Sequence, residues 1–147
     1  MAQVAITIKQ KGLDEVKAYF DNVKLRMKNL DPPLKQGGIL MLRSAETNFR
    51  FAGRPTWKPL AQSTLIWKLR NGYSPLPLTR SGDLRKSITF RVNRKILFVG
   101  TSIPYAAVHQ LGGRHVPARP FLIFQDKDIE RINQLIFEHI EGISNAG

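Results

Sequence analysis

The sequence predicts an α+β protein in which a small, mostly antiparallel sheet packs with two or three long helices. Three observations lead to this fold class. Apolar and polar residues alternate over residues 3–9, which is typical of a strand with one buried face. Apolar residues recur with helical spacing over residues 13–30 and again over 129–143, which predicts amphipathic helices. Two short apolar runs on either side of residues 93–95 predict a β-hairpin.

The predicted strand is followed by two helices. The first covers residues 13–30, and its apolar stripe is expected to pack on the rest of the fold while its charged residues face water. Asp31-Pro32-Pro33 is expected to break it. The second helix is expected to begin at about residue 33 and to run to about residue 51. Gly37-Gly38 weakens its first turns by about 1 kcal/mol per glycine, which indicates a kink or a close approach to another element.

Residues 53–82 predict a long loop, because seven Gly and Pro residues punctuate this stretch and no periodicity is present. Within it, residues 63–69 predict two helical turns capped by Ser63. Ser81 is expected to cap another short helix over residues 82–86. A loop of this length in a compact domain is usually functional or becomes ordered in an assembly.

The last third of the chain completes the sheet and adds a helix. Residues 88–92 and 96–99 predict the strands of a hairpin with a basic tip. The apolar run at 121–124 is expected to return to the same sheet. A helix over residues 126–143 follows, and the acidic residues in its first turn suit the helix dipole.

Composition restricts the architecture and the partners. A length of 147 residues with 42% hydrophobic residues predicts a single domain, residues 1–147, with its own core. No apolar run approaches the roughly 18 residues of a transmembrane helix, and the N-terminus lacks the plan of a signal peptide. The absence of cysteine fits folding in the cytosol. We therefore expect no membrane partner.

The positive charge is concentrated in the middle of the chain. The net charge is +12, and residues 43–95 alone hold twelve Lys or Arg against two Asp or Glu. Such a block favours contact with a polyanion or with an acidic partner surface, although a solvated basic face without a partner is the alternative. The side chains that would face DNA are the basic residues Arg80, Arg85, Lys86, Arg91, Arg94 and Lys95.

No group of residues predicts catalysis or a cofactor. His109 and His115 have no carboxylate near them in the sequence, whereas a zinc site needs three or four ligands. No Gly-x-Ser-x-Gly is present, and no Gly-Lys-Ser/Thr follows Gly112-Gly113. We expect no enzyme activity, no metal and no cofactor. His109 is expected to pack beside Tyr105 or to make a structural hydrogen bond.

The two tryptophans lie in the basic block, where exposed aromatic residues beside cations can stack on nucleic-acid bases. Tryptophan is usually largely buried, so for Trp57 we favour a place in the core or a subunit interface over base stacking. Trp67 lies beside Lys68 and close to Arg70, and both interpretations remain open for it.

The chain is organised around residues 99–124. Gly112-Gly113 allows positive φ at low steric cost. Pro117 and Pro120 bracket Arg119 and present it from a stiff backbone. Because no acidic partner lies near Arg119 in the sequence, we expect it to be structural or at an interface rather than catalytic.

The residues from Tyr105 to Gly113 and from Pro117 to Leu122 resemble the phage virion morphogenesis family, the tail completion proteins of long-tailed phages such as Mu. Further matches follow the family's order: Phe51 with Gly53, Trp57-Lys58-Pro59-Leu60, Thr64, residues 78–85, Ser87-Ile88 and residues 99–101. The resemblance covers about residues 39–125, and its specificity comes from the ordered combination. The positions that it marks as motif or interface residues are Trp57, Leu60, Thr79, Gly82, Leu84, Tyr105, His109, Gln110, Gly112, Gly113, Pro117, Arg119, Pro120 and Phe121.

The resemblance implies a structural protein that caps or joins the finished tail tube so that it can attach to a filled head. It implies a homo-oligomeric ring, often hexameric, with tail tube and head-completion proteins as partners. A basic lumen would face passing DNA without sequence preference. The protein would act in the host cytoplasm during assembly and then in the virion, at the tail or the head–tail junction. The alternative is a free-standing, sequence-nonspecific nucleic-acid-binding protein.

Overall fold

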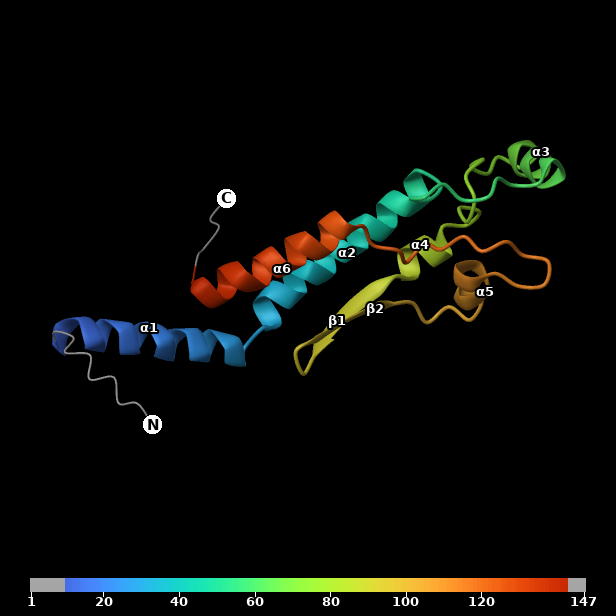
Figure 1. Ribbon diagram of the computed structural model, residues 1–147. Helices are drawn as coiled ribbons and strands as arrows, with labels where there is room; N and C mark the ends of the chain where they lie inside the picture. The colour runs from blue at the N-terminus through green and yellow to red at the C-terminus, as the bar shows by residue number, and fades with distance from the viewer. Residues whose placement is uncertain (1–9, 143–147) are drawn as a thin grey trace.

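The computed structural model describes residues 10–142 and confirms the α+β class. The strand predicted over residues 3–9 lies outside the described residues. The molecule is elongated, with α1 at one end and α3 near the other (Figure 1). Its elements are, in chain order, α1 (Gln10–Lys28), α2 (Asp31–Arg50), α3 (Gln62–Arg70), α4 (Asp83–Ser87), β1 (Thr89–Asn93), β2 (Ile96–Gly100), α5 (Ala106–Leu111) and α6 (Asp126–Glu141).

Helix α2 is the central element, because both α6 and the β1–β2 hairpin pack against it (Figure 1). Two adjacent glycines allow this packing. A Cβ atom added at Gly38 would lie 2.3 Å from the ring of Phe90 in β1, and one added at Gly37 would lie 3.2 Å from Ile132 in α6. The close approach predicted for Gly37-Gly38 is therefore confirmed, and it serves two neighbouring elements.

The core lies beside the C-terminal half of α2, where the helix meets irregular segments. Its buried members come from six parts of the chain and are Ala45, Phe49, Trp57, Leu84, Ile88, Ala106 and Phe121. The Phe49 ring lies with its centroid 5.9 Å from that of Trp57 and 5.5 Å from that of Phe121. Such aromatic pairs stabilise a fold by about 0.5–1.5 kcal/mol beyond their buried area.

A buried polar side chain joins α2 to the segment that precedes α6. Asn48 is fully buried, and its Nδ2 donates to the carbonyl oxygens of Phe121 at 2.8 Å and Ile123 at 2.9 Å. Its Oδ1 accepts a hydrogen bond from Nε of Arg54 at 2.9 Å. All polar atoms of this side chain therefore have partners, as a buried amide requires.

The start of α6 is tied to the same helix. Asp128 Oδ2 accepts a hydrogen bond from the Gln125 backbone at 3.0 Å and completes a capping box. The same oxygen accepts from Oγ of Ser44 at 2.5 Å. Gln125 Nε2 also donates to the carbonyl of Arg54 at 2.9 Å. The N-terminus of α6 is thus anchored to α2 by side chains on both elements.

The predicted hairpin with a basic tip is confirmed. β1 and β2 pair antiparallel, with Thr89 opposite Gly100 and Asn93 opposite Ile96. Arg94 and Lys95 connect the strands, and both have positive φ, 48° and 61°. This is the type I′ geometry that suits a two-residue hairpin loop, although these two residue types adopt it at a steric cost.

The prediction that residues 121–124 return to the sheet is wrong, since the sheet in the described residues contains β1 and β2 alone. This apolar run has no regular secondary structure. Its backbone groups bond to side chains of Asn48 and Gln110 in place of a neighbouring strand. Residues 121–124 thus bury side chains and satisfy their backbone groups without forming a third strand.

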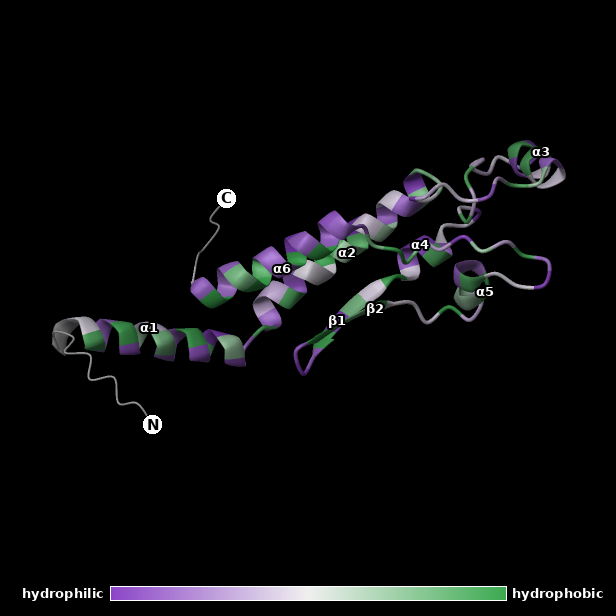
Figure 2. Cartoon of the chain, viewed as in Figure 1, coloured by the Kyte–Doolittle hydropathy of each residue, from purple (hydrophilic) through white to green (hydrophobic). Residues whose placement is uncertain are grey.

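The packing expected for the first helix is also wrong. α1 projects from the body and does not cover the sheet (Figure 1). Figure 2 shows hydrophobic residues along this helix, and Leu13, Val16 and Phe20 are exposed. It is held near its C-terminal end and middle by α6, where Tyr19 Oη donates to Glu141 at 2.7 Å. None of the described helices is long and apolar enough to cross a membrane.

Three helix starts differ from those predicted. Ala61 rather than Ser63 is the N-cap of α3. Gly82, with φ 79°, is the N-cap of α4, and the Ser81 hydroxyl donates instead to the Asp83 carboxylate at 2.7 Å. Asp31-Pro32-Pro33 forms the first turn of α2, where proline is tolerated because the missing N–H would have no helical partner.

Gly38→Ala is expected to lower the free energy of unfolding by about 1–3 kcal/mol, because the new methyl group collides with Phe90 and overpacks the α2–hairpin contact. The improved helix propensity of alanine offsets only about 1 kcal/mol of this cost. Urea denaturation followed by circular dichroism measures the change. Gly100→Ala is the matched control, since its Cβ would meet no atom within 4 Å. Equal stabilities of the two variants would contradict the proposed packing.

Candidate functional site

Arg119 joins two segments that lie far apart in the sequence. Its side chain is 7% exposed, and Nε and Nη2 donate to the carbonyls of Lys58 at 2.9 Å and Pro59 at 3.0 Å. Its backbone N–H donates to the carbonyl of His109 at 2.7 Å. A charged fork that satisfies two buried carbonyls contributes more than a neutral donor, so Arg119 has a structural role here.

Gln110 and Trp57 fasten the same irregular stretch. Gln110 Oε1 accepts from the backbone N–H groups of Phe121 and Leu122, both at 3.0 Å. Trp57 is 3% exposed, and its Nε1 donates to the carbonyl of Pro120 at 3.0 Å. We call Trp57, Gln110 and Arg119 the motif clasp, because all three use side chains to satisfy backbone groups that no helix or strand satisfies.

The glycine pair shapes the turn that leads into the motif clasp. Gly112 has φ 82°, and a Cβ there would lie 3.0 Å from the backbone nitrogen of Ala118. Gly113 and Val116 exchange backbone hydrogen bonds of 2.8 and 3.3 Å in a tight turn. The glycines therefore permit a close approach of two backbone segments, and Pro117 follows directly.

The remaining motif positions divide between the core and a cleft. Leu84 and Phe121 are buried in the core, and Thr79 Oγ1 donates to the carbonyl of Leu76 at 2.6 Å. A cleft of about 710 Å³ lies between α3 and the part of the molecule that carries α4 and α5. The predicted residues on its lining are Leu60, Arg80, Gly82, Leu84, Tyr105, His109 and Arg119.

Trp67 forms one wall of this cleft and is 44% exposed. Its ring stacks on that of Tyr73, with centroids 5.6 Å apart and planes 20° apart. The guanidinium carbon of Arg80 lies 4.9 Å from the Trp67 ring centroid and 5.6 Å from that of Tyr73. Both interpretations of Trp67 placed it beside cations, but the sequence did not reveal Tyr73 and Arg80 as its partners.

The cleft also contains Lys68, the neighbour of Trp67 in the sequence. Lys68 is 5% exposed, and its Nζ donates to the carbonyl of Leu76 at 2.6 Å. Burial, and secondarily the charge of Arg119, lowers the pKa of Lys68 below its ordinary value. Burial lowers the pKa of Arg119 as well. A loop carbonyl eight residues away accounts for the position of Lys68, and no local pattern signals such a contact.

His109 packs its ring edge-on against Tyr105, with centroids 5.8 Å apart. Its Nδ1 is buried and has no hydrogen-bond partner. Burial, and then the positive charge of Arg119, lowers the pKa of His109. Among the residues that the structure describes, no three His, Cys, Asp or Glu side chains come together in a way that would hold a metal.

The profile of the phage virion morphogenesis family matches residues 12–141. The chain belongs to this family. It is 32% identical over 130 residues to Mu-like prophage FluMu G protein 2 of Haemophilus influenzae, which covers 84% of this chain and 87% of that protein. It is 34% identical over 95 residues to "Putative capsid assembly protein G" of Escherichia phage Mu, over 56% and 61% of the two chains. No solved structure matches.

Family membership confirms the resemblance and supports a phage structural or assembly role for this chain. Such membership favours a non-enzymatic role. Within this family member, the motif clasp explains why widely separated motifs occur together. Trp57 bonds to the backbone of Pro120, Gln110 to that of Phe121, and Arg119 to that of Lys58. The chain segments that carry these three residues are therefore bonded to one another.

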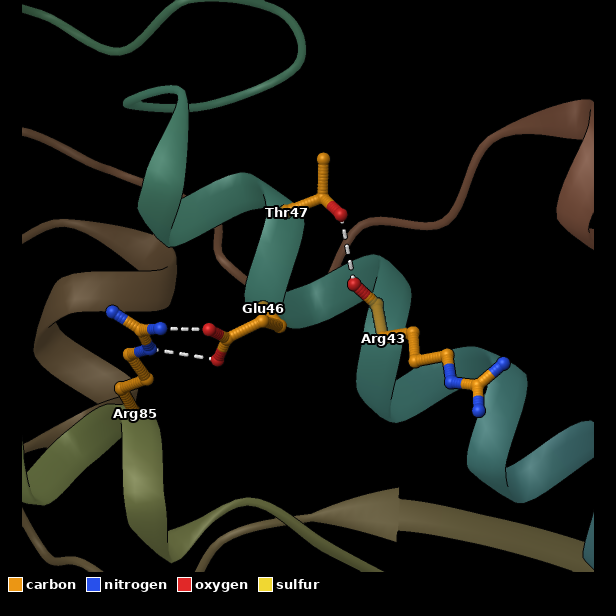
Figure 3. A network of polar contacts seen from close by, with 4 residues as sticks. All are labelled: Arg43, Glu46, Thr47 and Arg85. Carbon is orange, nitrogen blue, oxygen red and sulfur yellow. Dashed lines mark hydrogen bonds and ion pairs between the residues drawn. The ribbon is translucent and has the colours of Figure 1, made fainter.

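The basic side chains predicted to face DNA lie in different surroundings. Arg91, Arg94 and Lys95 are exposed on the hairpin, and the Arg91 guanidinium lies 5.0 Å from the Phe98 ring centroid. Arg80 belongs to the cleft instead. Arg85 forms a two-pronged ion pair with Glu46 of α2 (Figure 3). Lys86, in α4, is exposed and forms no ion pair with the described residues.

His109→Gln is expected to flatten the pH dependence of stability on the acid side. Because the folded pKa of His109 lies below its unfolded value, the unfolded chain takes up the proton first, and stability is lost as the pH falls from about 7 towards 5. Thermal midpoints of the wild type should fall more steeply over this range than those of the variant. His115→Gln, at an exposed position, controls for the loss of an imidazole. Identical slopes for wild type and His109→Gln would contradict the assignment of this pH dependence to His109.

Proposed function

We propose that this protein is a tail completion protein that forms a ring at the head–tail junction of a long-tailed phage or prophage. The observation that carries the proposal is the uncovered apolar face of α1. Leu13, Val16, Phe20 and Met27 are all about half exposed on a helix that projects from the body (Figure 2). Exposed apolar patches of this kind mark protein interfaces, and family membership supplies a setting in which subunits assemble.

The shape of the subunit supports a ring. A closed ring needs heterologous contacts, in which one patch meets a different patch on the neighbour. The elongated subunit presents the apolar face of α1 at one end and α3 near the other (Figure 1). The two ends therefore differ in shape and chemistry, as head-to-tail association requires. The basic hairpin tip, with Arg94 and Lys95, is available to line the lumen.

Phe20→Glu is expected to block self-association without unfolding the subunit, because Phe20 is 57% exposed and lies on the apolar face of α1. Light scattering should give a mass of several subunits for the wild type, and a hexamer if the ring is sixfold, but a monomer for the variant. A phage or prophage carrying the variant should accumulate filled heads and separate tails in electron micrographs.

Ile96→Glu is the matched control, since Ile96 is 53% exposed but lies on the hairpin. It should leave the mass of the wild-type assembly unchanged. A monomeric wild type at high concentration, or normal virions from Phe20→Glu, would contradict the proposed ring.

The second candidate is a free-standing nucleic-acid-binding protein, favoured by the exposed cations Arg91, Arg94 and Lys95. If the basic hairpin lines a ring lumen, its binding to duplex DNA should be electrostatic. If about five cations contact phosphates, the slope of log affinity against log salt is expected to be about −4 to −5, and replacing Arg94 and Lys95 by Gln should reduce it by about 2.

Titrations with two unrelated duplexes over a salt series measure this slope. Similar affinities for both duplexes agree with a passive lumen. A hundredfold preference for one sequence, or an affinity that hardly changes with salt, would support the dedicated nucleic-acid binder instead. Tight binding by a monomer that does not assemble would do the same.

A further inference from the structure

The cleft beside α3 concentrates positive charge against apolar walls. Lys68, Arg80 and Arg119 line it together with Trp67, Leu78 and Tyr105. Two of these cations are almost completely buried, Lys68 at 5% and Arg119 at 7% exposure. Long cationic side chains are almost never buried to this degree unless they are paired. The arrangement therefore requires an explanation beyond a solvated basic surface.

The charges of the cleft have no compensating carboxylate. In the part of the chain that the structure describes, ion pairs join Arg85 to Glu46 and Arg131 to Glu138, and none involves Lys68, Arg80 or Arg119. The acidic residue on the cleft lining is Asp83, and its carboxylate accepts a hydrogen bond from Ser81 at 2.7 Å.

Neutral carbonyls hold the buried cations in place. Leu76 accepts from Lys68, while Lys58 and Pro59 accept from Arg119. These bonds orient the side chains but leave their charge in a poorly solvated place, which agrees with the lowered pKa of both groups. A bound anion would offset this desolvation cost, since buried charges are stable when they are paired.

We propose that the cleft is a binding site for a carboxylate of a partner protein, presented on a peptide segment in which an acidic residue neighbours an apolar one. The carboxylate lies near Lys68, Arg80 and Arg119, and the apolar side chain packs between Trp67, Leu78 and Tyr105. The volume of about 710 Å³ accommodates a few side chains.

The cleft suits a peptide better than a nucleic acid. A phosphate backbone is bound by cations that project into solvent, as Arg94 and Lys95 do on the hairpin. Two of the cleft cations, Lys68 and Arg119, are instead recessed among apolar side chains, and the exposed Arg80 lies over the Trp67 ring. The Trp67 ring already stacks on Tyr73 and lies beside Arg80, so it is less available to a base.

This inference goes beyond the proposed joining role, because it concerns the chemistry that the cleft accepts and applies whether or not the subunits close a ring. Peptide binding can be measured in the Phe20→Glu variant as well, because this variant is expected to be monomeric with an unchanged cleft. Failure of ring formation would leave peptide binding intact, and failure of peptide binding would leave the ring mass unchanged.

Nuclear magnetic resonance of the full ¹⁵N-labelled chain offers a direct test, since the protein has two tryptophans. Titration with the blocked peptide acetyl-Leu-Glu-Phe-amide is expected to shift the indole N–H signal of Trp67 saturably. The indole signal of buried Trp57, which is bonded to the carbonyl of Pro120, serves as an internal control. Trp67→Phe assigns the two signals.

Three comparisons make the test specific. The Gln counterpart acetyl-Leu-Gln-Phe-amide should bind about tenfold more weakly, because the carboxylate is lost. Arg80→Gln should weaken the Glu peptide by about three- to tenfold and Arg80→Lys by less, since Arg80 is partly solvated. Arg70→Gln, an exposed arginine of α3 outside the cleft lining, should bind as the wild type does.

Several outcomes would overturn the proposal. They are equal affinity for the Glu and Gln peptides, no shift of the Trp67 signal at millimolar peptide, or equal weakening by Arg80→Gln and Arg70→Gln. A ten-nucleotide oligothymidylate that shifts the Trp67 signal at lower concentration than the Glu peptide, and does so through Arg80, would show that the cleft is a nucleic-acid site.

Discussion

The fold depends on one buried amide. Asn48 satisfies the carbonyls of residues 121 and 123 and is itself satisfied by Arg54. The segment that it holds carries Phe121 into the core beside Phe49. An unsatisfied buried carbonyl costs about 1–3 kcal/mol, so the apolar segment can lie here only if a side chain replaces the missing strand. Hydrophobic burial and hydrogen bonding are therefore coupled through a single residue of α2.

The same constraint explains the family motif. A chain with one two-stranded sheet in its described part has many irregular backbone groups to satisfy near its core. The motif clasp of Trp57, Gln110 and Arg119 does this with side-chain donors and acceptors. These side chains satisfy backbone groups, so the fold itself requires their exact chemistry. The apolar face of α1 and the hairpin tip lie outside the motif positions.

Elements whose own residues determine their conformation could be predicted from the sequence. Segments whose conformation depends on residues far away in the sequence could not. Helical periodicity predicted α1, α2 and α6, and the apolar runs on either side of residues 93–95 predicted the hairpin, because each signal lies within the element. Residues 121–124 have the composition of a strand, but Asn48 and Gln110 decide their conformation from far away. The motif positions of the cleft were named individually, whereas its shape arises only when residues 60–84 meet residues 105–119. The burial of Lys68 likewise depends on the loop that carries the carbonyl of Leu76.

The positive charge of the middle of the chain thus has two physical roles. On the hairpin, Arg94 and Lys95 remain hydrated and interact with any polyanion over a range that salt limits. In the cleft, Lys68 and Arg119 are desolvated, fixed by carbonyls and screened little by salt. A net charge alone cannot separate these roles, because it counts both groups equally. Burial separates them, and under the functions proposed above the cleft would select an anion of matching shape while the hairpin would accept any phosphate.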